Sequence, residues 1–594
     1  MLYGVFVRRA AGVLAAFATL AVAMAQGASS RPETTFLPIP SAAGARASSQ
    51  IINQRYHYPG TPGDYRLAVW MRDTMQHFGL RAWIESFTAT VYTPRHLELQ
   101  LLTSPTVTFD LHDGKIAADP DGSRPGVGLP FNAGSGNGDI RAPLVEVGRG
   151  LDADYARLAA AGVTVRGAIV LVRYGAEYRG NLAARAQTNG AAGVVFYNSP
   201  QDERPGRQYP NGPNRPPGAV QRGDVMGDDN VPLRIPTLPV TLPTAQRLIA
   251  NERGARALVH LSVQMNAGST TLWNTIGEVT GSNPAQSIVL GGHRDAWVYG
   301  VTDDGSGIAT LVELARGLGA LERSGWKPKR SIRIAGWDGE EIGELGSADY
   351  VRMHRDELQR GCVAYINVDE SAAGPHFRSE VAGALVPVML PAVADVLKIT
   401  HPPVDDPSGG SDYESFIYAL GTPIINLGYG GAFGTYHSTY DDFRFASLFA
   451  DPGFVHHRTI AQTVGLIALR LADADTIPFR FAPYSKSLDA GLQTLATSAS
   501  AKHLTLPTDL AAAVARFGPA AQAYDASASQ RDDRKTLQVA QQLDLLAYSA
   551  NGYASVAFPK VAAAIGTGRQ ADVDEAASQT VAALNAILSA LTPP

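Results

Sequence analysis

The sequence predicts an α/β protein built on a mixed, mainly parallel sheet with helices on both faces. Three changes of pattern along its 594 residues support this prediction. Between residues 273 and 472 buried strand patterns alternate with helical ones, which is typical of a mainly parallel sheet covered on both sides. Residues 105–263 contain many glycines and prolines with short strand patterns, which indicates an inserted, lid-like domain. After residue 477 alanine-rich helical periods predict a C-terminal helical bundle.

The first residues have the pattern of an export signal. Arg8 and Arg9 precede an apolar run over residues 10–25, which is shorter than the ~20 residues of a membrane span and ends in a small-x-small cleavage pattern. We expect residues 1–25 to be a cleaved signal peptide, so that the mature protein is periplasmic or secreted and keeps no stable membrane anchor. An uncleaved membrane helix is the alternative. Residues 31–49, rich in proline, alanine and serine, are expected to form a loose leader.

Composition excludes several kinds of partner. The formal net charge is −5 with both signs interspersed, so neither a nucleic-acid surface nor an anionic-membrane surface is expected. Cys362 is the single cysteine, and no intrachain disulfide can form. Hydrophobic residues make up 45% of the chain, which is enough for substantial cores.

Before the alternating region, the elements follow a clear order. Residues 64–78 have the period of an amphipathic helix, and strand-like patterns follow through Leu102. Residues 166–175 and 192–197 have the pattern of buried strands, with a helix between them. Residues 200–218 form a long loop rich in proline, glycine and arginine. Loops of this length in compact domains are usually functional or mobile.

Four apolar strand patterns in residues 273–472 are followed by residues that can bind a metal. The first leads into the segment GGHRDAWVYGVTDDGSG, residues 291–307, which ends at the start of a helix. The second strand leads into an acidic pair, the third into an aspartate, and the fourth into a glycine-rich loop that contains a histidine. In open α/β sheets, ligands bind beyond the carboxyl ends of the strands. The candidate ligands are His293, Asp303, Glu341, Asp369 and His437.

This set predicts a two-zinc centre, since mixed nitrogen and oxygen ligands suit zinc and their number suits two ions. Two divalent ions bring four positive charges, which three carboxylates and one bridging hydroxide balance. Such a centre acidifies water and stabilises the oxyanion of amide hydrolysis. Glu340, beside Glu341, is the candidate general base. Asp295, two residues after His293, is expected to orient the histidine ring from the second shell of ligands.

Each of these residues also has an ordinary structural explanation. The pair Glu340 and Glu341 fits a solvated helix start, where acidic residues complement the helix dipole. Asp295 could form a turn, and Asp303 could cap a helix. Five ligand types at successive strand ends nevertheless favour the metal centre.

Five segments then show a resemblance to a known family: GGHRDAWVYGVTDDGSG, WDGEEIGELGS, VAYINVD, YHSTYDDF and VRYGAEYRGN. From about Tyr58 to the C-terminus the chain resembles the zinc exopeptidases that include glutamate carboxypeptidase II and the transferrin receptor. The resemblance implies a phosphorylase/peptidase-like fold with an inserted protease-associated apical domain and a homodimer. The implied divisions are a signal peptide (1–25), the N-terminal part of the peptidase domain (26–104), the apical domain (105–270), the dizinc peptidase domain (271–476) and a helical dimerisation-like domain (477–594).

The resemblance also implies roles for the site residues. His293 and Asp369 would hold one zinc ion, and Glu341 and His437 the other. Asp303 and a water or hydroxide would bridge the two ions, and Glu340 would be the base. The transferrin receptor branch is not catalytic, whereas this chain keeps every ligand and the base.

Substrate residues correspond less evenly to the family pattern. Arg179, Tyr436 and Tyr553 match residues that bind the C-terminal carboxylate of the substrate in glutamate carboxypeptidases. Asp224 and Gly552 stand where an asparagine and a lysine bind the glutamate side chain. Gly552 lacks the positive charge of the lysine, and Asp224 adds a negative charge. We therefore expect the protein to have only a weak preference for substrates with an acidic side chain.

The expected protein is therefore an exported dizinc metallo-exopeptidase acting on short peptides, a carboxypeptidase with weakened acidic specificity. An aminopeptidase on the same dizinc core is the alternative, and Asp224 is a candidate for binding a substrate ammonium. A receptor-like dimer without catalysis is a third, less favoured hypothesis.

Overall fold

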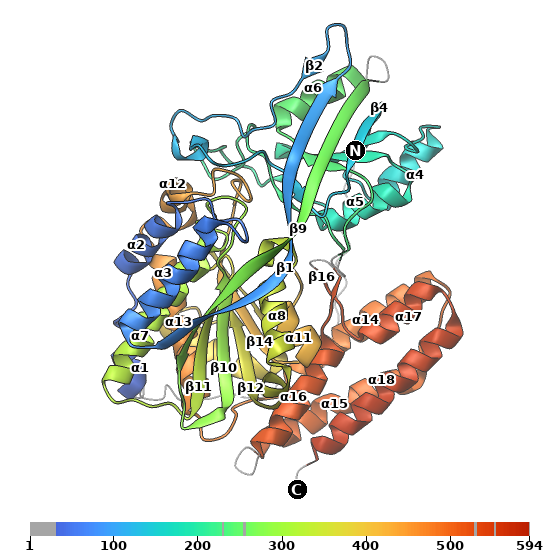
Figure 1. Cartoon of the computed structure of the whole chain (residues 1–594). Coiled ribbons are helices and arrows are strands. Elements are labelled where there is room, and N and C mark those ends of the chain that lie inside the picture. Colours follow the sequence, from blue (N-terminus) through green and yellow to red (C-terminus); the bar gives the residue numbers. More distant parts are fainter. Residues whose placement is uncertain (1–30, 228–230, 253–256, 528–531, 552–553, 593–594) are drawn as a thin grey trace, which may run out of the picture.

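The computed structural model describes residues 31–227, 231–252, 257–527, 532–551 and 554–592 (Figure 1). The expected signal peptide, residues 1–25, lies outside the described residues, as do Gly552 and Tyr553. Within the described part of the chain, no helix is long and apolar enough to cross a membrane.

A twelve-stranded mixed sheet runs through two halves of the molecule. Its main strand order is β13-β14-β12-β10-β11-β9-β4-β5-β6-β8, and β1 pairs with both β9 and β2. Strands β14, β12, β10 and β11 are mutually parallel, as are β4, β5, β6 and β8. The bounds on the peptidase side are β9 (Leu258–Val279), β10 (Asn283–His293), β11 (Arg330–Trp337), β12 (Cys362–Asn367), β13 (His376–Val381) and β14 (Ile424–Gly430). This sheet confirms the predicted α/β class.

Two long antiparallel strands join the halves. Strand β1 (Arg81–Leu101) pairs with β9 from Arg81 opposite Glu278 to Leu101 opposite Val259. In Figure 1 both strands run from the peptidase half into the apical half. The predicted boundary after residue 270 therefore lies inside β9 rather than in a linker.

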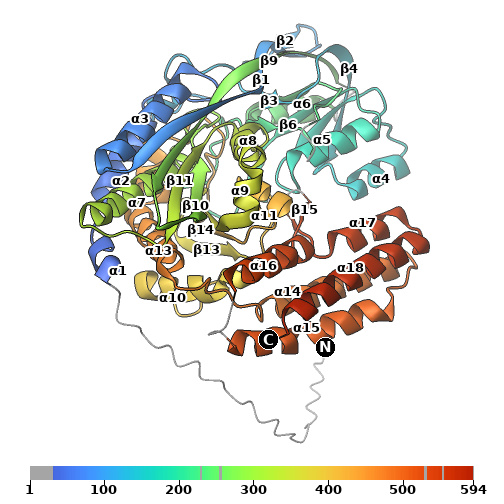
Figure 2. The same ribbon diagram turned by 60° about the horizontal axis from the view of Figure 1, so that its bottom comes forward.

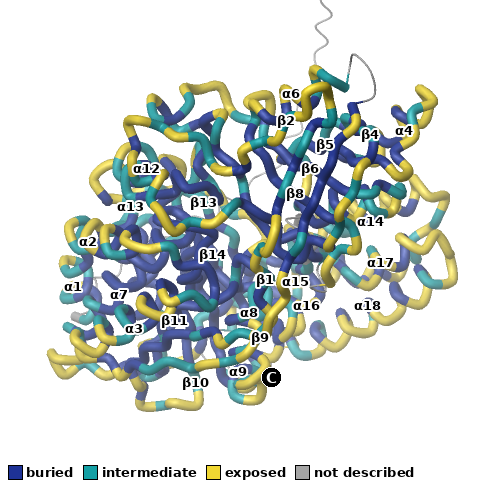
Figure 3. Tube along the Cα trace, turned by 45° about the horizontal axis from the view of Figure 1, so that its top comes forward, coloured by how far each residue is buried: buried dark blue, intermediate teal, exposed yellow. Residues whose placement is uncertain are grey.

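Helices cover both faces of the peptidase half. One layer contains α3 (Pro62–Phe78), α7 (Gly305–Arg323) and α13 (Val455–Asp473), and the other contains α8 (Leu345–Met353), α9 (Arg355–Gly361) and α11 (Tyr413–Leu420). The apolar strands between these layers are buried, as Figure 3 shows. Helix α10 (Val386–Leu397) and the short α12 (Phe443–Phe445) complete this half.

The expected loose leader is instead two packed helices, α1 (Arg31–Phe36) and α2 (Ala42–Ile52), and that expectation was wrong. The Phe36 side chain is fully buried. Its ring lies directly against Gly317 of α7 and Gly465 of α13, where any larger side chain would collide with it. Small residues on two long helices thus create the space that orders this segment.

The apical half contains the strands and helix predicted within the inserted region. The two predicted strands are β5 (Ile169–Arg173) and β6 (Gly193–Tyr197), and the helix between them is α5 (Arg179–Thr188). The other elements of this half are β2 (Val107–Thr108), β3 (Asn132–Ala133), β4 (Gly138–Gly148), β7 (Gly223–Asp224), β8 (Thr237–Pro239), α4 (Asp152–Ala160) and α6 (Leu242–Glu252). The predicted loop over residues 200–218 is a loop apart from one 3-10 turn, Pro200–Asp202, and an isolated bridge between Gln208 and Asn214.

The C-terminal helices gather on one side of the molecule, as predicted (Figure 2). They are α14 (Tyr484–Ala501), α15 (Thr508–Ala526), α16 (Asp533–Ala547), α17 (Pro559–Thr567) and α18 (Gln570–Ala590), with a small hairpin of β15 (Ala550–Asn551) and β16 (Ala554–Ser555). Helix α16 packs against α11, and the helices share one hydrophobic core with the peptidase half.

Candidate metal centre and active site

The structure brings all five predicted ligands together at one edge of the sheet. His293 is the last residue of β10, and the 3-10 turn Glu340–Ile342 follows β11. Asp369 comes two residues after β12, and His437 lies in the loop after β14. The carboxyl ends of these parallel strands meet at the same edge, which is why residues distant in sequence converge.

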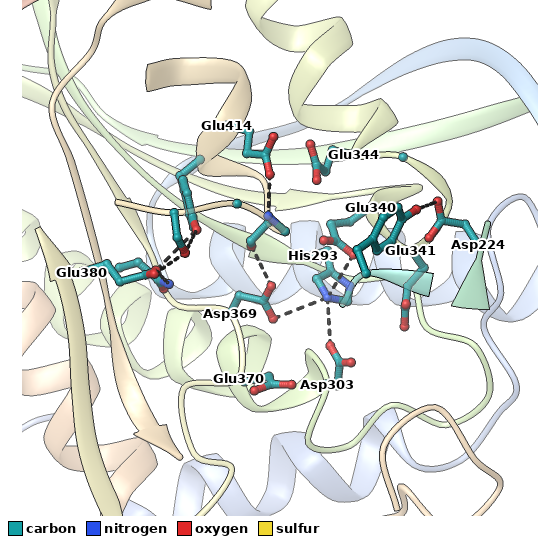
Figure 4. A pocket seen from close by; sticks show the side chains of 18 of the residues that line it. Asp224, His293, Asp303, Glu340, Glu341, Glu344, Asp369, Glu370, Glu380 and Glu414 are labelled. Atoms are coloured by element: carbon teal, nitrogen blue, oxygen red, sulfur yellow. Dashed lines mark hydrogen bonds and ion pairs between the residues drawn. The ribbon is translucent and has the colours of Figure 1, made fainter. Parts of the chain in front are cut away.

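Asp303 lies between the two histidines. Its Oδ1 is 3.1 Å from Nε2 of His293, and its Oδ2 is 3.1 Å from Nε2 of His437. Glu341 Oε2 is 3.0 Å from Nε2 of His437, while Asp369 Oδ1 is 3.5 Å from Nε2 of His293. The site thus consists of two donor groups on either side of one aspartate, and Figure 4 shows His293 with Asp303 and Asp369 around it.

Both histidines are oriented for cation binding. The Nδ1 atom of His293 is 2.9 Å from the main-chain oxygen of Asp295, and Nδ1 of His437 is 3.1 Å from that of Arg222. A carbonyl oxygen can only accept, so each Nδ1 carries the proton and donates it. When a cation takes the place of the proton on Nε2, each Nε2 can present its lone pair to that cation beside the carboxylates, which is the arrangement of metal-binding imidazoles.

The buried charges also call for a cation. Burial, opposed by His293 and reinforced by Asp369 and Asp412, raises the pKa of Glu340 well above its usual range. Burial lowers the pKa of His437, but Glu341 and Asp303 outweigh it and raise the pKa to about 9. Buried carboxylates at this density are costly unless a positive charge pairs with them.

Two buried carboxylate oxygens support the same conclusion. Asp369 Oδ1 and Asp304 Oδ2 have no hydrogen-bond partner among the described residues, and both residues belong with His293 to one potential metal-binding group. Asp303, Glu341 and His437 form the second group. The donor set of two imidazoles and several carboxylates fits zinc.

Asp304 rather than Asp303 caps helix α7. Its Oδ1 accepts the N–H groups of Gly307 at 2.8 Å and Glu370 at 3.0 Å. This leaves both oxygens of Asp303 directed at the histidines. Asp303 therefore lies between the histidines, where the family resemblance implied a bridging residue, and the capping role falls to its neighbour.

Asp295 acts differently from the sequence expectation. Its carboxylate lies 3.9 Å from Nδ1 of His293, and the main-chain carbonyl orients the ring instead. The carboxylate accepts the N–H groups of Gly339 at 2.8 Å, Glu340 at 3.2 Å and Glu341 at 3.3 Å. Asp295 therefore fixes the turn that carries the candidate base and a ligand.

Sequence reasoning missed two residues that hold ligands. Ser411, just before α11, donates its hydroxyl to Asp369 Oδ2 at 2.6 Å. Arg222, in the apical half, is paired with Asp113 at 2.8 Å and donates to the main-chain oxygen of His437 at 3.3 Å. Both contacts join residues far apart in the chain, and no local sequence pattern signals them.

Three of the five predicted substrate residues line the cavity that contains the metal groups. This cavity has a volume of about 510 Å³, and its wall includes Arg179, Asp224 and Tyr436. Arg179 donates its Nε to the main-chain oxygen of Asp224 at 2.8 Å and pairs with the Asp224 carboxylate at 3.2 Å. The ring of Tyr436 stacks on His437 with centroids 3.6 Å apart. A cavity of this size suits a short peptide or a small ligand.

Comparisons with known proteins agree with this geometry. The chain matches Peptidase family M28 over residues 274–450 and the PA domain over residues 140–228. A probable glutamate carboxypeptidase of Arabidopsis thaliana, LAMP1, is 29% identical over 511 residues, which cover 75% of this chain and 73% of that protein. The aminopeptidase NAALADL1 of Rattus norvegicus is 31% identical over 460 residues, or 62% of each chain.

Solved structures share the fold. A peptidase M28 precursor from Shewanella amazonensis has a TM-score of 0.56 at 21% identity, covering 75% of this chain and 97% of that one. A zinc aminopeptidase from Bacillus subtilis has a TM-score of 0.54 at 17% identity, covering 75% and 98%. Fold, site and sequence matches together define this chain as a metallopeptidase. Its residues 274–450 match peptidase family M28 and its residues 140–228 match the PA domain, in agreement with the resemblance of its motifs.

Proposed function

We propose that the protein is a zinc-dependent exopeptidase that removes the C-terminal residue from short peptides, with weak preference for acidic side chains. The observation that carries this proposal is Asp303, whose two oxygens each lie 3.1 Å from a histidine nitrogen. His293 and Asp369 would hold one zinc ion, and Glu341 and His437 the other. Bound zinc would polarise the scissile carbonyl and acidify the attacking water.

Glu340 is the proposed general base. Its Oε2 is 3.6 Å from Nε2 of His293, and it lines the cavity beside the metal groups. It would take a proton from the attacking water and deliver that proton to the leaving amine. The three N–H groups bound by Asp295 keep the turn of Glu340 in place for both transfers.

Carboxypeptidase action is supported by the wall of the cavity. Arg179 can offer a planar, bidentate contact to a terminal carboxylate, with Tyr436 nearby. Asp224 in the same wall disfavours an acidic side chain. Tyr553 and Gly552 remain proposed substrate residues.

Aminopeptidase action is the second candidate, and one contact favours it. Asp224 pairs with Arg179 and so reduces the positive charge available to a substrate carboxylate. A carboxylate in this position can also bind a substrate ammonium. Aminopeptidases are among the relatives and structural neighbours of the chain.

The direction of cleavage is tested with one tripeptide, Ala-Phe-Leu, in free, N-acetylated and C-amidated forms. Release of leucine from the acetylated form would establish a carboxypeptidase, and release of alanine from the amidated form an aminopeptidase. Glu340→Gln should reduce kcat by at least about 100-fold, as expected for loss of a general base. The exposed Glu575→Gln is the control. Full activity in Glu340→Gln would refute the assigned base, and no cleavage of any form by the unsubstituted protein would favour a receptor without catalysis.

Export and dimerisation complete the proposal. A periplasmic or secreted homodimer is supported by the N-terminal signal pattern and by the family resemblance of the C-terminal helices. N-terminal sequencing of the exported protein tests cleavage after Ala25, and light scattering measures its mass in solution. An unprocessed N-terminus or a monomeric mass would contradict the respective part.

A further inference from the structure

One wall of the cavity, away from the metal groups, is lined by three glutamates: Glu344, Glu380 and Glu414, here named the acidic wall. Glu344 immediately precedes α8, Glu414 lies in the first turn of α11, and Glu380 belongs to β13. All three are half-buried. Figure 4 shows Glu344 and Glu414 close to each other, with Glu380 farther away, to the left of Asp369.

The phenol of Tyr418 lines the same cavity as the three carboxylates and experiences the charge of each. Burial and the nearby charges of Glu414, Glu380 and Glu344 raise the pKa of this tyrosine well above its usual range. The negative potential of the acidic wall therefore acts on the space that a substrate would occupy.

Neutral groups hold Glu380. Its Oε2 accepts a hydrogen bond from Asn426 Nδ2 at 2.8 Å and one from the Tyr413 hydroxyl at 3.3 Å, and its Oε1 accepts one from the Ser408 hydroxyl. Hydrogen bonds to an ionised carboxylate fix its orientation without cancelling its charge.

The arginines of the cavity are engaged elsewhere. Arg179 pairs with Asp224, while Arg378 donates to the main-chain oxygen of Asp369 at 2.8 Å and lies 3.9 Å from the Glu370 carboxylate. Two divalent ions would offset the three carboxylates of the proposed ligands Asp303, Glu341 and Asp369 and the fourth carboxylate, that of the base. The acidic wall then gives the rest of the cavity an excess of negative charge.

We propose that the acidic wall binds a cationic nitrogen of the peptide substrate. This inference rests on the proposed exopeptidase function and names the substrate class of the same site. The nitrogen can belong to a lysine or arginine side chain or to the N-terminal ammonium, because both present a positive charge with several N–H donors. Attraction between unit charges is several times stronger in a half-buried cavity than in bulk water, so the preference should be measurable.

The test measures binding separately from turnover. The zinc-loaded Glu340→Gln protein is titrated calorimetrically with Ala-Lys, Ala-norleucine and Ala-Glu, each with a free and an N-acetylated terminus. If the side chain supplies the cation, Ala-Lys should bind about tenfold more tightly than Ala-norleucine, whether acetylated or not. If the ammonium supplies it, acetylation should weaken every peptide about tenfold. Ala-Glu should bind most weakly in either case.

Charge-neutral variants identify the wall as the cause. Glu344→Gln and Glu414→Gln, each added to Glu340→Gln, should reduce the preference for the charged peptide at least about threefold and together remove it. Glu575→Gln, an exposed glutamate on α18, is the matched control and should leave it unchanged. Unchanged melting temperatures and zinc contents would show that the variants remain folded and loaded.

The outcomes separate the inference from the proposed function. The inference would be overturned if neither a positive side chain nor a free N-terminal ammonium increased the affinity of the peptide. It would also be overturned if the preference for the charged peptide remained after both glutamine substitutions. If peptides with a positive charge bind more tightly but the unsubstituted protein cleaves none of them, the acidic wall would be supported and the proposed exopeptidase function contradicted. Failure of every peptide to bind would contradict both.

Discussion

Asp303 is the residue that links the two histidines of the site, because each of its oxygens faces a different one. Its backbone is fixed independently of any metal, since the Asp441 carboxylate accepts the N–H groups of Thr302 at 2.9 Å and Asp303 at 3.1 Å. The bridging position is therefore built by the loop itself and is available when a cation arrives.

Asp303→Asn keeps the shape of this side chain but removes its charge. We expect the variant to retain at most one zinc ion per chain after dialysis and to lose at least about 100-fold in kcat/KM, since even supporting contacts of a metal site are worth 10–100-fold. Elemental analysis gives the zinc content. Asp574→Asn, at an exposed aspartate of α18, is the control, and two retained zinc ions in Asp303→Asn would refute the bridging role.

At the scale of elements, α1 is held mainly by one aromatic ring. Phe36 is fully buried against Gly317 and Gly465, so truncation leaves a cavity that two long helices cannot close. Phe36→Ala should lower the free energy of unfolding by about 3–5 kcal/mol. Urea unfolding measures the change, with the exposed Thr34→Ala on the same helix as control. A loss below about 1 kcal/mol would mean that α1 does not contribute to the core.

Helix α16 carries a buried acid that makes stability depend on pH. Asp544 is fully buried, and its side chain accepts a hydrogen bond from the Tyr484 hydroxyl at 2.6 Å. Burial raises the pKa of Asp544 well above its usual value. The folded state therefore holds this proton more tightly than the unfolded chain. Its stabilising contribution is complete below the unfolded pKa of about 3.9 and is lost as pH rises through the raised folded pKa.

Asp544→Asn should remove this pH dependence. The asparagine is neutral at every pH, so the free energy of unfolding of the variant should rise relative to that of the unsubstituted protein between pH 4 and pH 9. Urea unfolding at pH 5, 7 and 9 measures the difference. Asp574→Asn should follow the unsubstituted protein, and a constant difference across pH for Asp544→Asn would contradict the assignment.

Periodicity explains which elements and site residues could be predicted. Strand β12 and the second half of β10 are buried and largely apolar, and each leads into a conspicuous ligand, so strand and site were visible together. Helix α1 was missed because it has only six residues and a proline, and glycines more than 250 positions away order it. Ser411 and Arg222 act through tertiary contacts alone, which a single sequence does not encode locally.

At the scale of the whole molecule, the metal groups connect four loops and both halves. His437 reaches the apical half through Arg222, and the other ligands follow strands of the peptidase half. A cation bound only in the folded state stabilises it by mass action, by about 2.7 kcal/mol at 100 times the dissociation constant. Exhaustive chelation should therefore lower the melting temperature, and zinc should restore it while magnesium should not. An unchanged melting temperature after verified zinc removal would contradict this linkage.

The long pairing of β1 with β9, interrupted by a register shift between Pro94 and His96, limits how the apical half can be moved, removed or exchanged. Both of its connections to the peptidase half are hydrogen-bonded strands of one sheet, so any movement of the apical half would have to bend or twist this two-stranded connection. Substrate entry must then depend on side chains and loops around the cavity or on a change of sheet twist. If this half were replaced by that of a relative, the two junctions would have to lie at residues of β1 and β9 that pair with each other. An offset of one residue would turn every side chain beyond the junction to the opposite face of the sheet.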